Sequence, residues 1–153
     1  MENMIKKYDL APHPEGGYFK EFYRAGQLIQ SDLAPGTRNA VTHIYFLLKK
    51  GQISRFHRVV HDEIWNFYEG DPIRLIQFDT KGIKEETIGP GRKEYVTIVP
   101  GNTWQAAATT GEYSLMGCTV APGFDFADFS FLRDTPDELA RFQTEQTGHA
   151  HFL

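Results

Sequence analysis

A histidine and a glutamate lie six residues apart between two glycines, and they are the side chains of this sequence best suited to chemistry. In the stretch GQISRFHRVVHDEIWNFYEG the four positions are Gly51, His57, Glu63 and Gly70. Side chains alternate between the two faces of a strand, so His57 and Val59 share a face, and a tight turn at residues 60–62 returns Glu63 to it. An imidazole that titrates near neutral pH beside a desolvated carboxyl forms a candidate acid–base pair.

Aromatic side chains accompany this pair. Trp65 and Phe67 follow Glu63 at intervals of two residues, and Trp104 begins another predicted strand. Such side chains are expected first as packing, because inward aromatic residues fill a small barrel. Stacking on a bound small molecule is the alternative. His61 falls at the turn, where it either leans over the mouth of the site or is solvated.

The elements that position these residues are short strands separated by glycine and proline turns, such as Pro35-Gly36, Gly89-Pro90-Gly91 and Pro100-Gly101. The predicted strands are 19–24, 41–48, 73–78, 83–88, 95–99, 113–121 and 129–132, together with those of the central stretch and one that begins near 104. About ten short strands predict an all-β fold, an antiparallel jelly-roll barrel that leaves few exposed edges.

Two short helices and one shaped loop complete the prediction. Apolar spacing indicates a helix over 2–8, and Thr135-Pro136-Asp137-Glu138 has the form of a capping box that opens a helix over 136–145. The loop PHPEGGYF, residues 12–19, contains two stiffening prolines and two glycines. It is expected first as a structural turn; in the alternative, Glu15 or Tyr18 borders the site.

Length and charge limit the classes of function. The chain has 153 residues, is 41% hydrophobic and is expected to form one domain over residues 1–153. Its net charge is −4 and its basic residues are scattered, so no nucleic-acid partner is expected. The single cysteine, Cys118, excludes an intrachain disulfide and is predicted to be buried and inert. No apolar run approaches the ~18 residues that span a membrane. Because the amino terminus lacks the apolar core of a signal peptide, we expect a cytoplasmic protein with no membrane partner.

The central spacing resembles the first signature of the cupin superfamily, with Val59 where a metal-binding cupin has its second histidine. In the region of the second signature, Pro100 fits and Gln105 occupies the position of the histidine ligand. Together with HPEGGYF near the start and GCTVAPGFDFADF near the end, the chain resembles the cupin-5 group, domain of unknown function 985, over nearly its whole length. The resemblance implies a cupin double-stranded β-helix that is usually a dimer.

Three functions are compatible with the sequence and with this resemblance. In the first, His57 and Glu63 perform metal-free acid–base chemistry on a sugar-like or other carbonyl substrate, as an isomerase or epimerase does. Metal-free cupins that epimerise keto-sugars pair a histidine base with a tyrosine acid. The candidates for such a tyrosine here are Tyr45, Tyr68 and Tyr113.

In the second, the barrel binds a small molecule without changing it, with Trp65, Phe67 and Trp104 stacking on it and polar residues orienting it. In the third, a divalent metal is held by His57, Glu63 and Gln105, with His61 in place of the missing histidine. An amide oxygen replaces an imidazole poorly. The sequence therefore favours a site without a cofactor.

A homodimer is the expected assembly. The predicted strand 19–24 lies at a sheet edge, and pairing across a two-fold axis would cover it. Asp125 and Asp128 lie in a bend among phenylalanines, where a dimer contact or turn capping is expected rather than catalysis.

Overall fold

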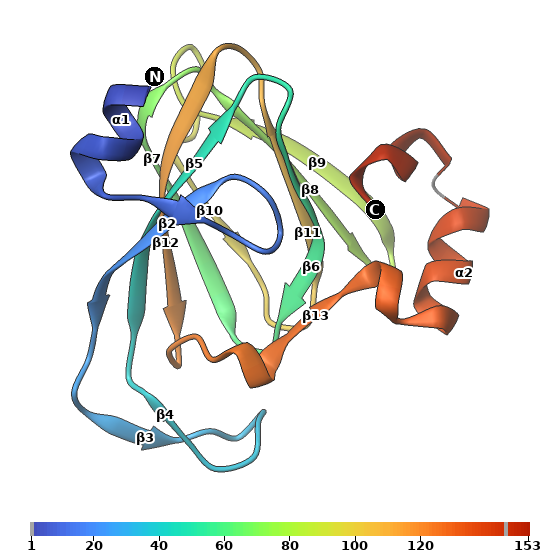
Figure 1. Ribbon diagram of the computed structural model, residues 1–153. Helices are drawn as coiled ribbons and strands as arrows, with labels where there is room; N and C mark the ends of the chain where they lie inside the picture. The colour runs from blue at the N-terminus through green and yellow to red at the C-terminus, as the bar shows by residue number, and fades with distance from the viewer. Residues whose placement is uncertain (1, 146) are drawn as a thin grey trace.

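The computed structural model describes residues 2–145 and 147–153, and these residues form thirteen strands, two α-helices and three 3-10 helices (Figure 1). The first part of the chain contains α1 (Glu2–Tyr8), β1 (Ala11–Pro12), β2 (Tyr18–Arg24), β3 (Leu28–Gln30), β4 (Thr37–Asn39), β5 (Thr42–Lys49), β6 (Ile53–Val59) and β7 (Asp62–Gly70). The second part contains β8 (Ile73–Asp79), β9 (Gly82–Ile88), β10 (Val96–Val99), β11 (Trp104–Thr109), β12 (Tyr113–Ala121), η1 (Phe126–Asp128), β13 (Phe129–Phe131), η2 (Leu132–Asp134), α2 (Pro136–Glu145) and η3 (Thr147–Phe152).

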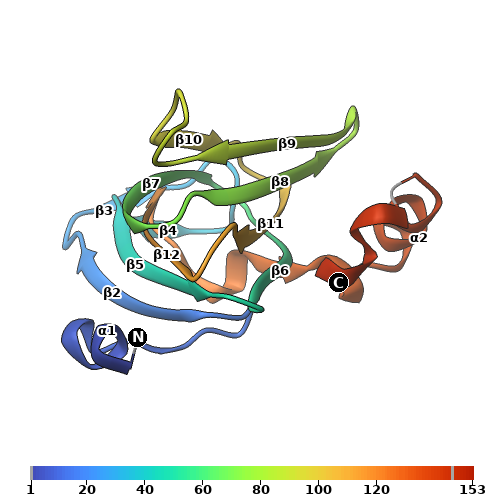
Figure 2. The same cartoon turned by 90° about the horizontal axis from the view of Figure 1, so that it is seen from above.

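Two antiparallel sheets face each other across a common interior (Figure 2). The first has the strand order β1-β2-β5-β12-β7-β10 and the second has the order β13-β6-β11-β8-β9. The hairpin β3–β4 lies beyond one end of the barrel, next to η1 and β13 (Figure 1). The predicted all-β jelly-roll barrel, with a short helix near each terminus, is confirmed.

Three apolar clusters hold these layers together. The interior of the barrel is filled by side chains from both sheets, among them Phe46, Trp65 and Leu75. On the outside of the second sheet, Trp104 and Phe56 pack under Phe142 of α2. On the outside of the first sheet, α1 covers a smaller cluster that includes Leu47 and Leu115. Each sheet therefore buries both faces in part, which explains why strands such as β5 and β8 are apolar with little alternation.

The predicted bounds of both α-helices are confirmed, whereas the side chains at the start of α2 do not act as a capping box. Thr135 Oγ1 donates to the carbonyl of Phe131, at 3.2 Å. Glu138 accepts hydrogen bonds from Arg58 Nη1, at 2.8 Å, and from Trp104 Nε1, at 2.5 Å. A buried indole N–H requires an acceptor, and this requirement determines the position of Glu138.

No helix among residues 2–145 and 147–153 is long and apolar enough to cross a membrane.

The loop between β1 and β2 crosses the edge of β6. It hydrogen-bonds to β6 just beyond the residues of β6 that pair with β13. The Arg55 N–H donates to the Glu15 carbonyl at 2.8 Å, and the Gly16 N–H closes a turn onto the His13 carbonyl at 3.0 Å. Gly16 has φ +114°, and a Cβ at this position would overlap the Ile53 carbonyl oxygen. Only glycine fits this crossing, which places Glu15 against the barrel.

We expect Gly16→Ala to lower the free energy of unfolding by about 2 kcal/mol or more, because it adds an overlap with backbone to the strain of a positive φ. Urea denaturation measures this loss. The matched control is Gly36→Ala, with φ +82° and no atom within 4 Å of the new Cβ, where strain acts alone. Equal losses in the two variants would show that the crossing does not depend on the missing side chain.

Candidate functional site

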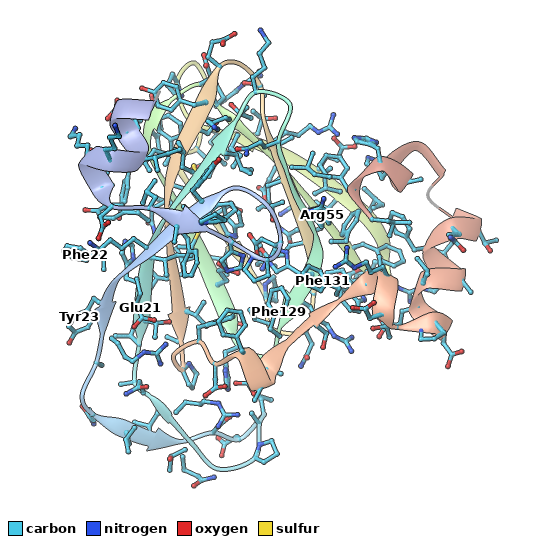
Figure 3. All side chains as sticks on the ribbon, in the orientation of Figure 1. Glu21, Phe22, Tyr23, Arg55, Phe129 and Phe131 are labelled. Carbon is cyan, nitrogen blue, oxygen red and sulfur yellow. The ribbon has the colours of Figure 1, made fainter. Side chains whose placement is uncertain are left out.

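A cavity of about 290 Å³ lies between the two sheets, at the end of the barrel crossed by the segment 124–129. Its wall is mainly apolar and is formed by Phe19, Ile44, Phe46, Val59, Val120, Phe124, Phe126 and Phe129. Its buried polar side chains come from the β1–β2 loop, β5, β6, β7 and β12, and they are His13, Glu15, Thr42, His57, Glu63 and Cys118. In Figure 3, Phe129 marks the end of the barrel at which these groups meet.

His57 of β6 is fixed in one tautomer by the backbone. Its Nδ1 lies 2.7 Å from the carbonyl oxygen of Arg55. A carbonyl can only accept a hydrogen bond, so Nδ1 carries a proton and the lone pair of the neutral ring is on Nε2. The ring is stacked on Phe129, with centroids 5.3 Å apart. Burial lowers the pKa of His57, although Glu63 and the Arg55 carbonyl oppose this shift. The ring is therefore neutral near pH 7.

Glu15 faces the Nε2 atom of His57 at 3.1 Å from its Oε2. Its other oxygen accepts a hydrogen bond from Ser54 Oγ at 2.9 Å. Burial raises the pKa of Glu15 to about 8, and the Ser54 hydroxyl reduces the shift only in part. Near pH 7 the contact is thus between a carboxylic acid and a neutral imidazole. Glu15 donates to His57, and one proton is held between the two groups.

His13 completes this side of the cavity. The backbone N–H of Glu15 donates to its Nδ1 at 3.2 Å, so the proton of the neutral ring is on Nε2. Burial lowers the pKa of His13 to about 3, and the neighbouring His57 lowers it further. The ring packs edge-on against Phe19, with centroids 4.6 Å apart. His13 is therefore a neutral polar group of the wall.

Glu63 is the second residue of β7, and the side-chain amide of Gln105 orients its carboxyl. Gln105 Nε2 donates to Glu63 Oε2 at 2.5 Å, and Gln105 Oε1 accepts from Trp65 Nε1 at 2.9 Å. Burial raises the pKa of Glu63 to about 7; the nearby His57 lowers it, the Glu15 carboxyl raises it, and hydrogen bonds from Gln105 and Cys118 favour the charged form. Glu63 is thus a cavity carboxyl whose raised pKa makes both its protonated and its ionised form accessible near neutral pH.

The structure brings the predicted residues His57 and Glu63 together in the cavity, but most of the other nominated residues lie outside its lining. Gln105 is fully buried behind Glu63. Trp65 packs edge-on against Phe46 in the barrel core, with centroids 5.7 Å apart. Phe67 packs at the edge of the same core, and Trp104 faces α2 on the other side of the second sheet.

His61 is buried in a separate polar network at the β6–β7 turn. Its Nε2 lies 2.8 Å from Ser31 Oγ, and its Nδ1 lies 3.7 Å from Asp128 Oδ2. Asp128 in turn accepts two hydrogen bonds from Arg38, both at 2.7 Å. Ser31 Oγ already accepts the N–H groups of residues 33 and 34, so it is a turn-forming hydroxyl and not a nucleophile. The network joins the β3–β4 hairpin to η1.

The candidate tyrosine acids lie on the outer face of the first sheet. Tyr68 Oη contacts His43 Nε2 at 2.9 Å, Tyr45 packs against Tyr8, and Tyr113 donates to Glu69. None of them lines the cavity. The acid facing His57 is Glu15 instead, which the sequence suggested only as a residue bordering the site, and His13 was not nominated. Their signal was the loop PHPEGGYF, whose glycines permit the close crossing of β6.

Comparison with known proteins places this arrangement in a family. Residues 2–132 match the family described as Cupin superfamily (DUF985). The chain belongs to this family. The cupin is 29% identical to an uncharacterised protein of Saccharomyces cerevisiae, over 91% of this chain and 78% of that protein. A structure of a hypothetical protein from Leishmania major covers 84% of this chain and 85% of its own, with 32% identity and a TM-score of 0.78.

Two further structures show how far the likeness extends. A protein from Shewanella oneidensis has a TM-score of 0.77 and 30% identity, over 85% of this cupin and 82% of its own chain. Oxalate decarboxylase from Bacillus subtilis has a TM-score of 0.58 and 17% identity, over 79% of this cupin and 29% of that chain. The second likeness is one of fold alone.

Many cupins hold a metal, and the donors of this cupin do not suit one. Among residues 2–145 and 147–153, no three histidine, cysteine, aspartate or glutamate side chains are grouped so as to hold a metal ion. Val59 supplies no donor at the position of the second histidine. Gln105 uses its oxygen for Trp65 and its amino group for Glu63. Gln105 and Glu63 thus belong to a hydrogen-bonded chain with Trp65, and His57 is held by the Arg55 carbonyl and Glu15.

The raised carboxyl pKa values predict that stability falls with rising pH. Unfolded carboxyls titrate near 4.5, whereas folded Glu63 and Glu15 titrate near 7 and 8. Above pH 6.5, the folded state therefore binds more protons than the unfolded state. The lowered pKa values of His13 and His57 act in the opposite sense, but only below 6.5. We expect the Tm to fall by on the order of 5 °C between about pH 6.5 and 8.5.

Differential scanning calorimetry across this range tests the prediction. Glu15→Gln keeps the shape of the side chain and should remove much of the fall, because the amide has no proton to lose. The control Glu112→Gln alters an exposed ion pair with Lys50 and should retain the fall. A Tm that rises between pH 6.5 and 8.5 would contradict the assignment of buried carboxylic acids.

Proposed function

We propose that this cupin catalyses proton transfer at a carbon next to a carbonyl group of a small molecule, as an isomerase or epimerase does. The observation that carries the proposal is the pairing, in one cavity, of a carboxyl with a pKa of about 7 and a carboxylic acid that shares its proton with a neutral imidazole. A base and an acid whose pKa values lie near the working pH suit such a reaction.

In the proposed mechanism Glu63 is the general base. Its carboxylate takes the proton from the carbon, and the electron pair of that bond forms an enolate with the substrate carbonyl. The substrate oxygen faces the Glu15–His57 pair, whose proton is transferred to it to give a neutral enol. The O–H proton of the enol then returns to the Glu15–His57 pair while Glu63 gives its proton back to carbon. Delivery to the opposite face of the same carbon gives the epimer, and delivery to the former carbonyl carbon of an enediol, with loss of the proton from the other oxygen, gives the isomer.

The surrounding contacts support these roles. Gln105 holds one oxygen of Glu63 and so fixes the orientation of the carboxyl in the cavity. Ser54 and the Arg55 carbonyl hold the two partners of the acid. The apolar wall excludes water and so strengthens the electrostatic interactions of the site. We propose that the reaction uses these side chains without a metal, because the donors are engaged with one another.

Binding without catalysis is the second candidate function. The phenylalanine wall favours it, because such a surface retains a small apolar ligand whether or not a reaction follows. The two functions differ in what a change at Glu63 removes: an enzyme loses a rate, and a binding protein loses only affinity.

Deuterium exchange tests the proposal before the natural substrate is identified. A panel of small ketones and aldehydes is incubated with the protein in D2O, and the NMR signal of the protons next to the carbonyl is followed. We expect enzyme-dependent loss of that signal for at least one compound. Glu63→Gln should slow it by about 10²-fold to 10⁴-fold, because the general base is lost.

The controls separate this activity from contamination and from metal catalysis. Glu112→Gln, on the surface, should leave the exchange rate unchanged, and so should dialysis against EDTA. Exchange that persists in both Glu63→Gln and His57→Ala would contradict the proposed roles. So would exchange that EDTA abolishes and added divalent metal restores.

We also propose that the cupin is a homodimer formed through β2. β1 pairs only with Tyr18 and Phe19, so β2 has an unpaired edge from residue 20 onward. Five of its seven residues are exposed, and Phe22 and Tyr23 lie on the outer side of the strand (Figure 3). Exposed aromatic side chains beside an open strand edge favour pairing with a second copy.

Sedimentation velocity at micromolar concentration should show a dimer. Replacing both Phe22 and Tyr23 by glutamate should produce a monomer, because four like charges would face each other across the two-fold axis. Leu28→Glu, at an exposed position of β3, is the control and should remain dimeric. A wild-type protein that sediments as a monomer would contradict the assembly.

A further inference from the structure

The charged residues of the cavity indicate which substrates it admits. Arg24 is the single lysine or arginine side chain in the cavity lining that the described residues form. Its guanidinium already makes four hydrogen bonds. Nε and Nη2 donate to the two oxygens of Glu21, at 2.9 and 2.7 Å, and Nη1 donates to Asn39 Oδ1 and to the Phe124 carbonyl, at 2.9 and 3.1 Å. A guanidinium has five N–H groups, so this fork is almost fully used.

Among the described residues that line the cavity, no second cation takes the place of the Arg24 guanidinium, which is already paired. His13 and His57 are neutral near pH 7, because burial lowers the pKa of each. Arg55 does not line the cavity, and its Nη1 points to the backbone carbonyl of Glu15, at 3.4 Å. Glu21 and Asp125 line the mouth. A carboxylate or phosphate entering the cavity would meet these acidic groups and would lose its hydration without gaining a cationic partner.

The wall also limits the number of hydroxyl groups that a substrate can carry. Five phenylalanines line the cavity, and the Thr42 hydroxyl already accepts the N–H of Phe124 at 2.9 Å. Apart from the charged residues of the mouth, Glu21, Arg24 and Asp125, the remaining polar groups are gathered around His57 and Glu63. Hydroxyl groups spread around a sugar ring would face phenylalanine and lose their hydrogen bonds with water.

The volume sets the size of the substrate. A cavity of ~150 Å³ holds a benzene ring, and this cavity has about 290 Å³. The space suits a ring with a short substituent. The polar groups suit one carbonyl oxygen and one acidic carbon.

We propose that the substrate is an uncharged carbonyl compound with an apolar ring-sized body and few hydroxyl groups, and that the Glu21–Arg24 pair excludes anionic compounds. The carbonyl part rests on the function proposed above, whereas the exclusion of anions and polyols rests on the lining alone. The sequence led us to expect a sugar-like or other carbonyl substrate. The cavity lining now excludes free sugars and sugar phosphates from that class.

The test compares three probes of similar size by ligand-observed NMR titration: acetophenone, benzoate and D-xylose. Acetophenone is uncharged and apolar, benzoate has the same ring with a carboxylate, and D-xylose is a neutral polyol. We expect acetophenone to bind at least about tenfold more tightly than either of the others. Benzoate or D-xylose binding as tightly as acetophenone, or acetophenone not binding at 10 mM, would overturn the proposal.

A gain-of-binding variant tests the role of the ion pair. Glu21→Gln removes the charge that neutralises Arg24 and weakens the hold on its Nε and Nη2 groups, which then become available to an anionic ligand. We expect benzoate to bind about tenfold more tightly to this variant than to the wild type, with acetophenone unchanged. Glu112→Gln is the control and should leave both affinities unchanged. An unchanged affinity of Glu21→Gln for benzoate, or an equal gain for both probes, would overturn the role of the pair.

These outcomes are independent of the proposed chemistry. Binding of acetophenone with no deuterium exchange into its methyl group would support the substrate class and argue against proton transfer. Exchange on a carboxylate or a sugar would support proton transfer and overturn the substrate class. A variant that retains the wild-type melting temperature and acetophenone affinity is folded, so its benzoate affinity reports on the ion pair.

Discussion

The burial of two carboxyl groups between the sheets is the constraint on which the rest of this structure depends. A carboxylate removed from water is unstable unless it is neutralised or hydrogen-bonded. This cupin meets the requirement without a cation in contact. Glu15 retains its proton and receives one bond from Ser54, and Glu63 receives bonds from Gln105 and Cys118. Each partner belongs to a different strand, so both sheets must pack correctly before the two carboxyls are satisfied.

The same constraint explains why Gln105 lies where many cupins place a metal-binding histidine. An amide has a donor at one side and an acceptor at the other, so it links the buried indole of Trp65 to the buried carboxyl of Glu63. A neutral imidazole also has one donor and one acceptor, but it can take up a second proton beside the carboxyl, whereas the amide stays neutral. Glutamine at position 105 therefore forms part of a hydrogen-bonded chain at a position that binds metal in other cupins. The ionisable group of this chain is the Glu63 carboxyl, which faces the cavity.

Much of the fold could be predicted from the sequence because it depends on local rules. Glycine and proline turns predicted where the strands begin and end, and the spacing of apolar residues predicted α1. Alternation along β6 and the return at residues 60–62 brought His57 and Glu63 to one side, as the structure shows. The side chains whose positions could not be predicted are those that contact elements packed outside their own sheet. Trp104 faces outward because α2 covers that side of its sheet, and His61 turns to Ser31 because the β3–β4 hairpin supplies a hydroxyl.

Glu15 shows the limit of such reasoning most clearly. Its neighbours Gly16 and Gly17 indicate a tight path, but only the contact with Ile53 and Arg55 decides which strand the loop crosses. Pairings between residues about forty positions apart leave little trace in a single sequence. Helix-starting signals are similarly ambiguous, because Glu138 matches the capping pattern and yet serves Arg58 and Trp104.

The tautomers of the two cavity histidines are set by peptide groups and not by side chains. The Arg55 carbonyl fixes the ring of His57, and the Glu15 N–H fixes the ring of His13. Peptide groups are the same whatever side chain is attached, so mutation at positions 15 or 55 leaves these two contacts available. Evolution within this scaffold can therefore replace the surrounding phenylalanines and acquire new ligands, while the direction in which each imidazole presents its lone pair is inherited unchanged.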